Sequence, residues 1–369
     1  MAERRGAQRR ETIREGHAAL SFVLSLSLAV AACANDAVTG APSAGPSGDA
    51  GSFEASLDTP PDARAPSPQA DGGADARAPE RDAGTGATDD GGEAMGPYDT
   101  DGPLSFTVQT ASVTNGGRTF TVTAYVPSSA GGAPVVSLSP GLLQPASAYA
   151  VYGRRFASHG IAMLVRDDPG ALSVTTDVAA DIAYTVTTWM PTALAGKVDS
   201  GKVGLIGHSR GGKATLLAAE GALKGHAKAW FGLDPIDSSA FGGGGPQARD
   251  GLAAIGVPTA YLGASVASTC SPVGDNYDVL FAAGATPSVK LTGVGAGHTQ
   301  LEDGTACSAC GLCTPAGTAD SAQVLAYALR YATAFFAREL LGDTHVGAAF
   351  EGAGAASDVA AGRVQIVAK

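Results

Sequence analysis

The stretch Lys202-Val-Gly-Leu-Ile-Gly-His-Ser-Arg-Gly-Gly-Lys213 decides the fold of this 369-residue chain. Residues 202–207 form a short, mostly apolar run that predicts a buried strand. Residues 211–222 are rich in Ala and Leu and predict a helix. Gly207 and Gly211 flank the turn, where small residues let the strand and the helix approach each other closely. The stretch therefore predicts a strand, a sharp turn at Ser209 and a helix.

Strand and helix patterns alternate on both sides of this turn. Two leading strands with alternating apolar and polar residues are joined at Asn115-Gly116, a hairpin signal. Further strands are predicted at 134–138, 161–166, 227–233, 258–263 and 288–294, after the leading pair at 105–113 and 119–126. Helices are predicted at 146–159, stopped by Gly160, and at 174–190, 211–222 and 322–341. This order predicts an α/β fold with a mostly parallel sheet and helices on both faces.

Charge and composition divide the chain into four parts. The net charge is −11, and residues 34–101, rich in Ala, Gly, Pro and Asp, account for it with fourteen acids and three Arg. A segment so poor in large apolar side chains predicts a disordered linker. We expect a catalytic domain at 102–343 and a tail at 344–369. The net charge of −11 argues against nucleic-acid binding, which needs basic clusters.

The N-terminal segment, residues 1–33, reads as an export signal. Five Arg precede an apolar run from Ala18 to Ala32, which is short for a transmembrane helix. Its end, Leu28-Ala-Val-Ala-Ala-Cys33, resembles the lipobox of bacterial lipoproteins, with Cys33 as the lipidated residue. An ordinary cleaved signal is the alternative. We expect an exported protein, attached by this lipid alone to the outer membrane or cell surface.

Ser209 and His298 are the candidate nucleophile and base. Gly-x-Ser-x-Gly between a strand and a helix is the pattern of a nucleophile elbow, which exposes the serine oxygen beside a helix N-terminus. Among six histidines, His298 lies in Gly295-Ala-Gly-His298, a loop after a predicted strand. The carboxyl end of a strand is where a fold with the chain order nucleophile, acid, histidine is expected to place its base.

The candidate acid is Asp234, which directly follows the strand 227–233. The stretch 264–269 after the next strand contains no carboxylate, although that is the usual position. Asp237 and Asp275 remain as alternatives. The acid would hold the tautomer of the imidazole and stabilise the imidazolium.

Two backbone amides are expected to form an oxyanion hole. One belongs to Arg210, directly after the nucleophile. The other belongs to the loop Ser139-Pro-Gly-Leu-Leu-Gln144, where Leu142 is favoured over Leu143. The side chains of Leu142, Leu143, Gln144 and Arg210 are the candidate specificity determinants. For Arg210, a structural salt bridge is the alternative.

These residues resemble the α/β-hydrolase superfamily, and within it the chlorophyllase-like esterases. The matching pieces are Gly207-His-Ser-Arg-Gly-Gly-Lys213, Leu233-Asp-Pro235, Cys270-Ser-Pro-x-Gly-x-Asn276, and Gly297-His298 with Leu301-Glu-Asp303. In that group the acid lies in the Asp-Pro motif, so the resemblance also implies Asp234. Ser139-Pro-Gly141 and Phe156-Ala-Ser-His-Gly160 look like bacterial polyester hydrolases and cutinase-like enzymes, which usually keep the acid on the later strand.

Four cysteines remain after Cys33, namely Cys270, Cys307, Cys310 and Cys313. An oxidising compartment favours two disulfides over a metal site. We expect Cys270 to pair with one of the three clustered cysteines, and the other two to pair locally. Such a link would brace the loop of His298.

The sequence therefore predicts a serine carboxylic-ester hydrolase that needs neither a cofactor nor a metal. Only 23 residues separate Asp234 from Pro258, too few for a helical cap domain over the site. A polyester or cutin-type depolymerase is a second hypothesis, and a catalytically silent binding module on the same fold is a third. No oligomeric state follows from the sequence.

Overall fold

The computed structural model describes residues 98–128, 131–167, 173–239, 244–304, 310–346, 350 and 352–369. The chain divides into two units, and all described residues belong to the second, Glu93–Lys369. The signal, Cys33 and most of the linker lie outside the described residues. None of the helices in the described part is both long and apolar enough to cross a membrane.

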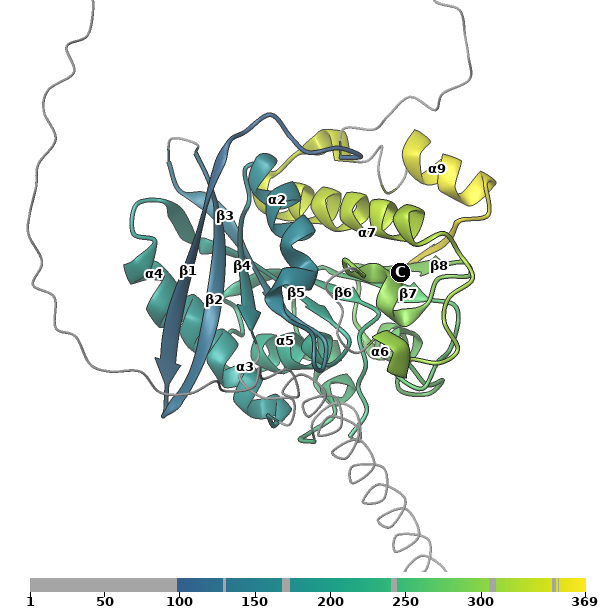
Figure 1. Ribbon diagram of the computed structural model, residues 1–369, viewed down its shortest axis with the longest axis horizontal. Coiled ribbons are helices and arrows are strands. Elements are labelled where there is room, and N and C mark those ends of the chain that lie inside the picture. Colours follow the sequence, from purple (N-terminus) through teal and green to yellow (C-terminus); the bar gives the residue numbers. More distant parts are fainter. Residues whose placement is uncertain are drawn as a thin grey trace, which may run out of the picture. The chain divides into compact units, whose positions relative to one another are not determined.

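One nine-stranded sheet organises the unit, in the order β1-β2-β4-β3-β5-β6-β7-β8-β9 (Figure 1). The six strands from β4 to β8 in this order are parallel, whereas β1, β2 and β9 join antiparallel. The strands are β1 (Phe106–Asn115), β2 (Arg118–Pro127), β3 (Ala133–Ser139), β4 (Ala162–Asp167), β5 (Val198–His208), β6 (Ala227–Leu233), β7 (Thr259–Ala264), β8 (Ser288–Gly293) and β9 (Val364–Ala368). The expected fold class, a mostly parallel α/β-hydrolase fold, is confirmed.

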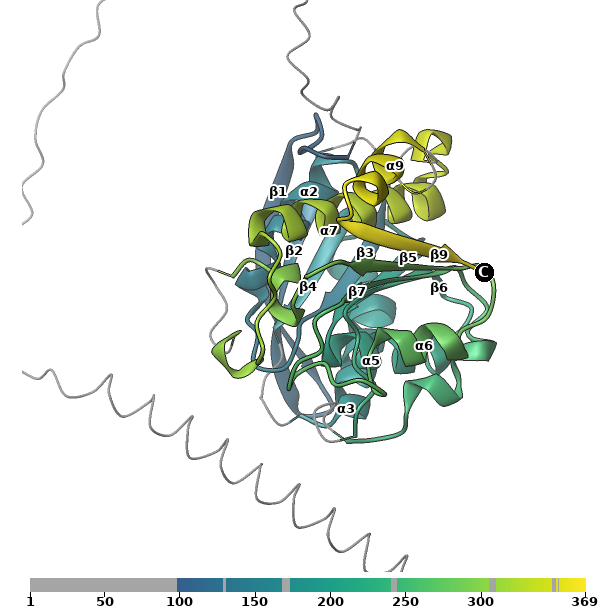
Figure 2. The same ribbon diagram turned by 90° about the vertical axis from the view of Figure 1, so that its right-hand side faces the viewer.

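Helices cover both faces of this sheet (Figures 1 and 2). One face carries α2 (Ala150–Ser158), α7 (Ser321–Phe336) and α9 (Ala353–Ala360), and the other carries α3 (Thr175–Tyr184), α5 (Arg210–Glu220) and α6 (Tyr277–Ala283). The remaining helical pieces are α4 (Met190–Ala193), the single turns η1 (Ala146–Tyr149), η3 (Ala248–Asp250), η4 (Leu252–Ala254), η5 (His298–Leu301), η6 (Cys310–Leu312) and η8 (Thr344–Val346), and the π-helical turns η2 (Thr185–Trp189) and η7 (Ala337–Leu341).

Each face of the sheet has its own apolar core. Strand β6 shows how one strand serves both, because successive side chains point to opposite faces. Phe231 packs with Phe335 and Phe336 beneath α7. Its neighbour Trp230 packs with Tyr261 on the side of α5. Burial on both faces explains why the central strands are continuous apolar runs without alternation.

The predicted hairpin is confirmed. Asn115 pairs with Arg118 at its end. Gly116 and Gly117 form the two-residue loop with φ values of 56° and 83°, a left-handed conformation that favours glycine.

Both predicted boundaries of the catalytic domain need correction. At the start, Tyr98 is buried, and Arg155 donates hydrogen bonds to the carbonyl of Tyr98 and the carboxylate of Asp101. The domain therefore begins before residue 102. At the end, the segment 344–369 is not a tail, because it contributes α9 and β9, and β9 pairs along β8. The predicted tail was wrong because this short strand is stabilised by its partner rather than by its own pattern.

Helix α6 was not predicted from the sequence. It is short, and its N-cap is Asn276, whose side-chain oxygen accepts a hydrogen bond from the Asp278 amide at 3.2 Å. Asn276, the last residue of the motif Cys270-Ser-Pro-x-Gly-x-Asn276, therefore serves as the N-cap of α6.

Candidate active site

Ser209 occupies a strained turn between β5 and α5. Its φ is 54° and its ψ is −125°, which a residue with a side chain rarely adopts. The turn is held on both sides, because the Ser209 amide donates to Leu233 O at 3.0 Å and the Ile236 amide donates to Ser209 O at 3.1 Å.

Glycine is required at the two positions flanking Ser209, because the neighbouring backbone leaves no room for a Cβ atom. A Cβ on Gly207 would lie 2.3 Å from the carbonyl oxygen of Gly211, and one on Gly211 would lie 2.1 Å from that of Ser139. The predicted strand–turn–helix is therefore present, with the close approach that was inferred from the small residues.

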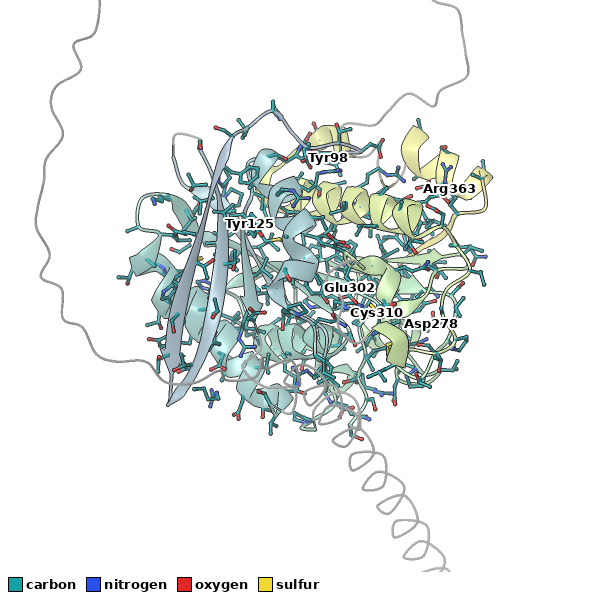
Figure 3. The ribbon with its side chains drawn as sticks, in the orientation of Figure 1. Tyr98, Tyr125, Asp278, Glu302, Cys310 and Arg363 are labelled. Carbon is teal, nitrogen blue, oxygen red and sulfur yellow. A yellow bond between two sulfur atoms is a disulfide. The ribbon has the colours of Figure 1, made fainter. Side chains whose placement is uncertain are left out.

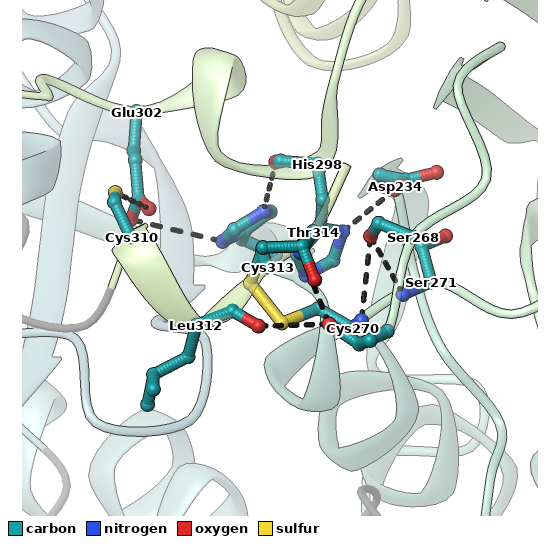
Figure 4. The surroundings of a disulfide bond; sticks show 12 residues. Asp234, Ser268, Cys270, Ser271, His298, Glu302, Cys310, Leu312, Cys313 and Thr314 are labelled. Carbon is teal, nitrogen blue, oxygen red and sulfur yellow. Dashed lines mark hydrogen bonds and ion pairs between the residues drawn. A yellow bond between two sulfur atoms is a disulfide. The ribbon is translucent and has the colours of Figure 1, made fainter. Parts of the chain in front are cut away.

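Asp234 and His298 meet at the carboxyl edge of the sheet. Asp234 follows β6 directly and is fully buried, and His298 opens the single turn η5 after β8. The distance between His298 Nδ1 and Asp234 Oδ2 is 2.6 Å (Figure 4). A carboxylate only accepts, so Nδ1–H is the donor and Nε2 is the ring nitrogen left for other chemistry. The contact expected between the two residues is present in the structure.

The backbone around Asp234 places its carboxylate. The residue has a φ of 38°, and its amide donates to Leu262 O at 2.7 Å. Its second oxygen, Oδ1, accepts a hydrogen bond from the Ala264 amide at 3.1 Å. The side chain is therefore fixed from the neighbouring strand β7, the strand whose following segment carries no acid.

The two alternative acids, Asp237 and Asp275, both bond to Arg249. Asp237 accepts hydrogen bonds from the Ala248 amide at 2.7 Å and from Arg249 Nε at 2.8 Å. Asp275 accepts one from Arg249 at 3.0 Å. Neither makes the contact with His298 that Asp234 makes.

The loop after β3 lies against the elbow. Gln144 donates its amide to Gly141 O at 3.2 Å, which closes a turn in which Leu143 has a φ of 63°. A Cβ on Gly141 would lie 3.4 Å from Ser209 Cβ, so this loop borders the serine directly. The Leu142 amide makes no hydrogen bond within the described part of the chain. Arg210 is the first residue of α5, and amides in the first turn of a helix have no partner within the helix.

The side chain of Arg210 is buried. Its guanidinium donates to Ser173 O at 3.0 Å, and burial together with the neighbouring Arg166 lowers its pKa to about 10. This contact holds the segment before α3, which agrees with a structural role for the Arg210 side chain, while its contact with substrate stays a prediction. Gln144 is also buried, whereas Leu142 and Leu143 are partly exposed.

A disulfide joins Cys270 to Cys313 (Figure 4). The expectation that Cys270 pairs with one of the clustered cysteines is confirmed. Cys310 is disulfide-bonded as well. Cys307 lies outside the described residues, so the expected local pair stays a prediction. Within the described ranges, no group of three or more His, Cys, Asp or Glu side chains is arranged to hold a metal ion.

Sequence reasoning missed a buried polar cluster beside these residues, made of Tyr149, His208 and Glu302. His208 Nδ1 lies 2.7 Å from Tyr149 Oη and 3.8 Å from Glu302 Oε2. The ring of His208 lies 4.7 Å from that of His298, centroid to centroid. Burial raises the pKa of Glu302 to about 7, although the Tyr149 hydroxyl and His298 oppose the shift. Glu302 is buried and lies near Cys310 (Figure 3). Because these three residues lie far apart in the sequence, no local pattern predicts that they form a cluster.

Comparison with known proteins supports an ester hydrolase. Residues 93–271 match a family described as PETase: PET hydrolase-like, a stretch that includes Ser209 and Asp234. No curated protein matches the chain. The match favours the polyester-hydrolase side of the resemblance over the chlorophyllase side. The chain thus has an α/β-hydrolase fold, and over residues 93–271 it is similar to PET hydrolase-like proteins.

Proposed function

We propose that this protein is a serine carboxylic-ester hydrolase, with Ser209 as nucleophile, His298 as base and Asp234 as the acid that orients it. The observation that carries the proposal is the buried 2.6 Å contact between Asp234 and His298, at the sheet edge where Ser209 sits in its strained turn. Such a contact fixes an imidazole in the tautomer that leaves Nε2 to accept a proton.

The proposed reaction has two steps. Ser209 Oγ attacks the ester carbonyl while His298 Nε2 takes its proton, and the amides of Leu142 and Arg210 stabilise the negative oxygen that forms. His298 returns the proton to the leaving alcohol, and an acyl-enzyme remains on Ser209. Water then attacks the acyl group while His298 takes its proton, and His298 returns that proton to Ser209 Oγ as the acid leaves. The mechanism needs no cofactor.

A fluorophosphonate probe tests this proposal, because it reacts with activated serines. We expect the wild type to be labelled and to hydrolyse p-nitrophenyl esters. Ser209→Ala should lose both properties while keeping its circular dichroism spectrum. A wild type that folds and is neither labelled nor active would instead indicate a silent binding module.

A polyester is the second candidate substrate class, favoured by the match of residues 93–271 to PET hydrolase-like proteins. The connection from β6 to β7 contains only the single turns η3 and η4 in its described part, so it supplies no helical cap there. An open site would accept an ester presented on a polymer. Release of soluble products from a polyester film, compared with turnover of short soluble esters, separates the two candidates.

Attachment through Cys33 is part of the proposal. It is supported by the sequence Leu28-Ala-Val-Ala-Ala-Cys33 and the long polar segment that follows. Cells grown with labelled palmitate should label the wild type and not Cys33→Ala. Equal labelling of both would remove the lipid anchor, and with it the proposed location at the outer membrane or cell surface.

A further inference from the structure

A chain of buried hydrogen bonds connects three loops around Ser209. The Gly141 amide lies 3.1 Å from Tyr149 Oη, which lies 2.7 Å from His208 Nδ1. His208 Nε2 lies 3.0 Å from the carbonyl oxygen of His298. Neither Tyr149 nor His208 is more than 1% exposed. The chain therefore runs from the loop of Leu142, through the elbow, to the backbone of the candidate base.

The direction of each hydrogen bond follows from chemistry. The His298 carbonyl can only accept, so His208 carries its hydrogen on Nε2. Burial, and the charge that His298 can carry, lower the pKa of His208 well below its usual value, so the ring is neutral. Nδ1 then has only a lone pair and accepts from the Tyr149 hydroxyl. The Tyr149 oxygen in turn accepts from the Gly141 amide. The Glu302 carboxyl is a second hydrogen-bonding neighbour of the Tyr149 hydroxyl, and it lies beside the chain without being one of its links.

We infer that Tyr149 and His208 are positioning residues for ester hydrolysis, holding the Leu142 turn and the His298 backbone in place on either side of Ser209. The inference rests on the proposed function, because it assigns a task to those two loops. Tyr149 fixes the first residue of the turn, and His208 fixes the residue that carries the base.

Close contact makes this link specific. A Cβ on Gly141 would lie only 2.9 Å from His208 Nδ1, so only glycine lets the turn settle against the ring. Glu302 Oε2 also faces Nδ1, at 3.8 Å, beyond hydrogen-bonding distance. Tyr149 is thus the group that bonds to this nitrogen.

A second tyrosine provides a matched control. Tyr152 is buried in α2, and its hydroxyl donates to Leu301 O at 2.6 Å. It therefore contacts the same histidine loop as His208 does, but none of its hydrogen bonds reaches Gly141 or His208. Tyr152→Phe removes one buried hydroxyl from the same region without breaking the chain.

The test compares Tyr149→Phe with Tyr152→Phe in the full-length protein. For Tyr149→Phe we expect kcat for a p-nitrophenyl ester to fall about 10- to 100-fold with KM within about twofold, since displacing an oxyanion donor costs less than removing it. Affinity for a boronic acid, which forms a tetrahedral adduct with the serine, should fall by the same factor as kcat/KM. Tyr152→Phe should lower the melting temperature by a similar amount and leave kcat within about threefold.

A second variant guards against a folding defect. His208→Gln keeps an amide donor toward His298 and loses the acceptor for Tyr149. Combined with Tyr149→Phe, it should cost no more than the larger single loss, because both break one chain. If Tyr149→Phe matches Tyr152→Phe in kcat and boronate affinity, or if the two losses add, the positioning role is wrong while ester hydrolysis stands. A wild type without any ester turnover would overturn both.

Discussion

Asp234 and Asp237 follow the same strand, β6, three residues apart, and both are fully buried, yet they bond to different kinds of partner. Asp234 receives one backbone amide and the imidazole of His298. Asp237 receives two backbone amides and the guanidinium of Arg249, with Lys213 Nζ at 3.9 Å.

The difference lies in whether the positive partner can exchange a proton. Arg249 is permanently charged, so Asp237 is locked in a fixed ion pair that anchors the loop between β6 and β7. A histidine gains and loses its charge, so Asp234 can stabilise a charge that exists only during a reaction. Burial is the same for the proposed catalytic carboxylate, Asp234, and for Asp237, whereas their partners differ. Each prediction below tests this distinction.

The largest effect is expected for Asp234→Asn. The amide keeps the shape of the carboxylate and removes its charge, so the imidazole loses both its preferred tautomer and its counter-charge. Turnover of a p-nitrophenyl ester should fall about 10⁴-fold with little change in melting temperature. Steady-state kinetics on the purified variant measure this. A loss below about tenfold would end the assignment of Asp234 as the acid.

Asp237→Asn should show the reverse pattern. It leaves the buried Lys213 and the partly exposed Arg249 without their main counter-charge, which should lower the free energy of unfolding by about 3 kcal/mol. The folded fraction should keep its kcat within about tenfold of the wild type. Urea unfolding combined with active-site titration separates the two quantities. A variant of normal stability and very low kcat would exchange the roles of the two aspartates.

Glu302 extends the comparison to a buried carboxylate without a cation. Its pKa is about 7 in the folded protein, above the ordinary value of 4.5, so between these pH values the folded state holds a proton that the unfolded state has released. The contribution of Glu302 to stability therefore falls as pH rises through this range. Glu302→Gln removes the titrating group. Its free energy of unfolding, relative to that of the wild type, should therefore rise by on the order of 2 kcal/mol from pH 5 to pH 8. Urea unfolding at both pH values measures the gain, and an equal stability difference at the two would contradict it.

The smallest effect is expected for Asp275→Asn. Asp275 pairs with the same arginine as Asp237, at 3.0 Å, but its side chain is 35% exposed. Water screens such a pair, so the free energy of unfolding should fall by less than about 1 kcal/mol and activity should not change. Thermal unfolding side by side with Asp237→Asn gives the comparison. A loss as large as that of Asp237→Asn would mean that the exposure of a carboxylate in this cluster does not predict its contribution to stability.

Local patterns in the sequence were sufficient for most of the fold. The strand before Ser209, the helix after it and the hairpin at Gly116 each depend on neighbours in sequence, and each is present. Strand β9 was missed because its partner β8 lies some seventy residues earlier, and five residues alone carry too little pattern.

The residues of the candidate site also divide into those that the sequence predicts and those that it does not. Asp234 and His298 could be selected because strand ends converge at one edge of a parallel sheet. Tyr149 could not, because a tyrosine in an apolar segment reads as core until its hydroxyl partner is known. Glu302 appeared only as part of a motif, and the burial that raises its pKa is a property of the packed structure.

The three non-glycine residues with positive φ among the described residues, Leu143, Ser209 and Asp234, all lie around this site. Each such backbone costs on the order of 1 kcal/mol, and glycine would relieve it. Two of the three carry side chains that the proposed chemistry uses, and the third, Leu143, lies in the turn that carries the proposed oxyanion donor Leu142. Efforts to make the protein more heat-resistant should therefore leave these three backbone positions unchanged and work on strands away from this edge of the sheet.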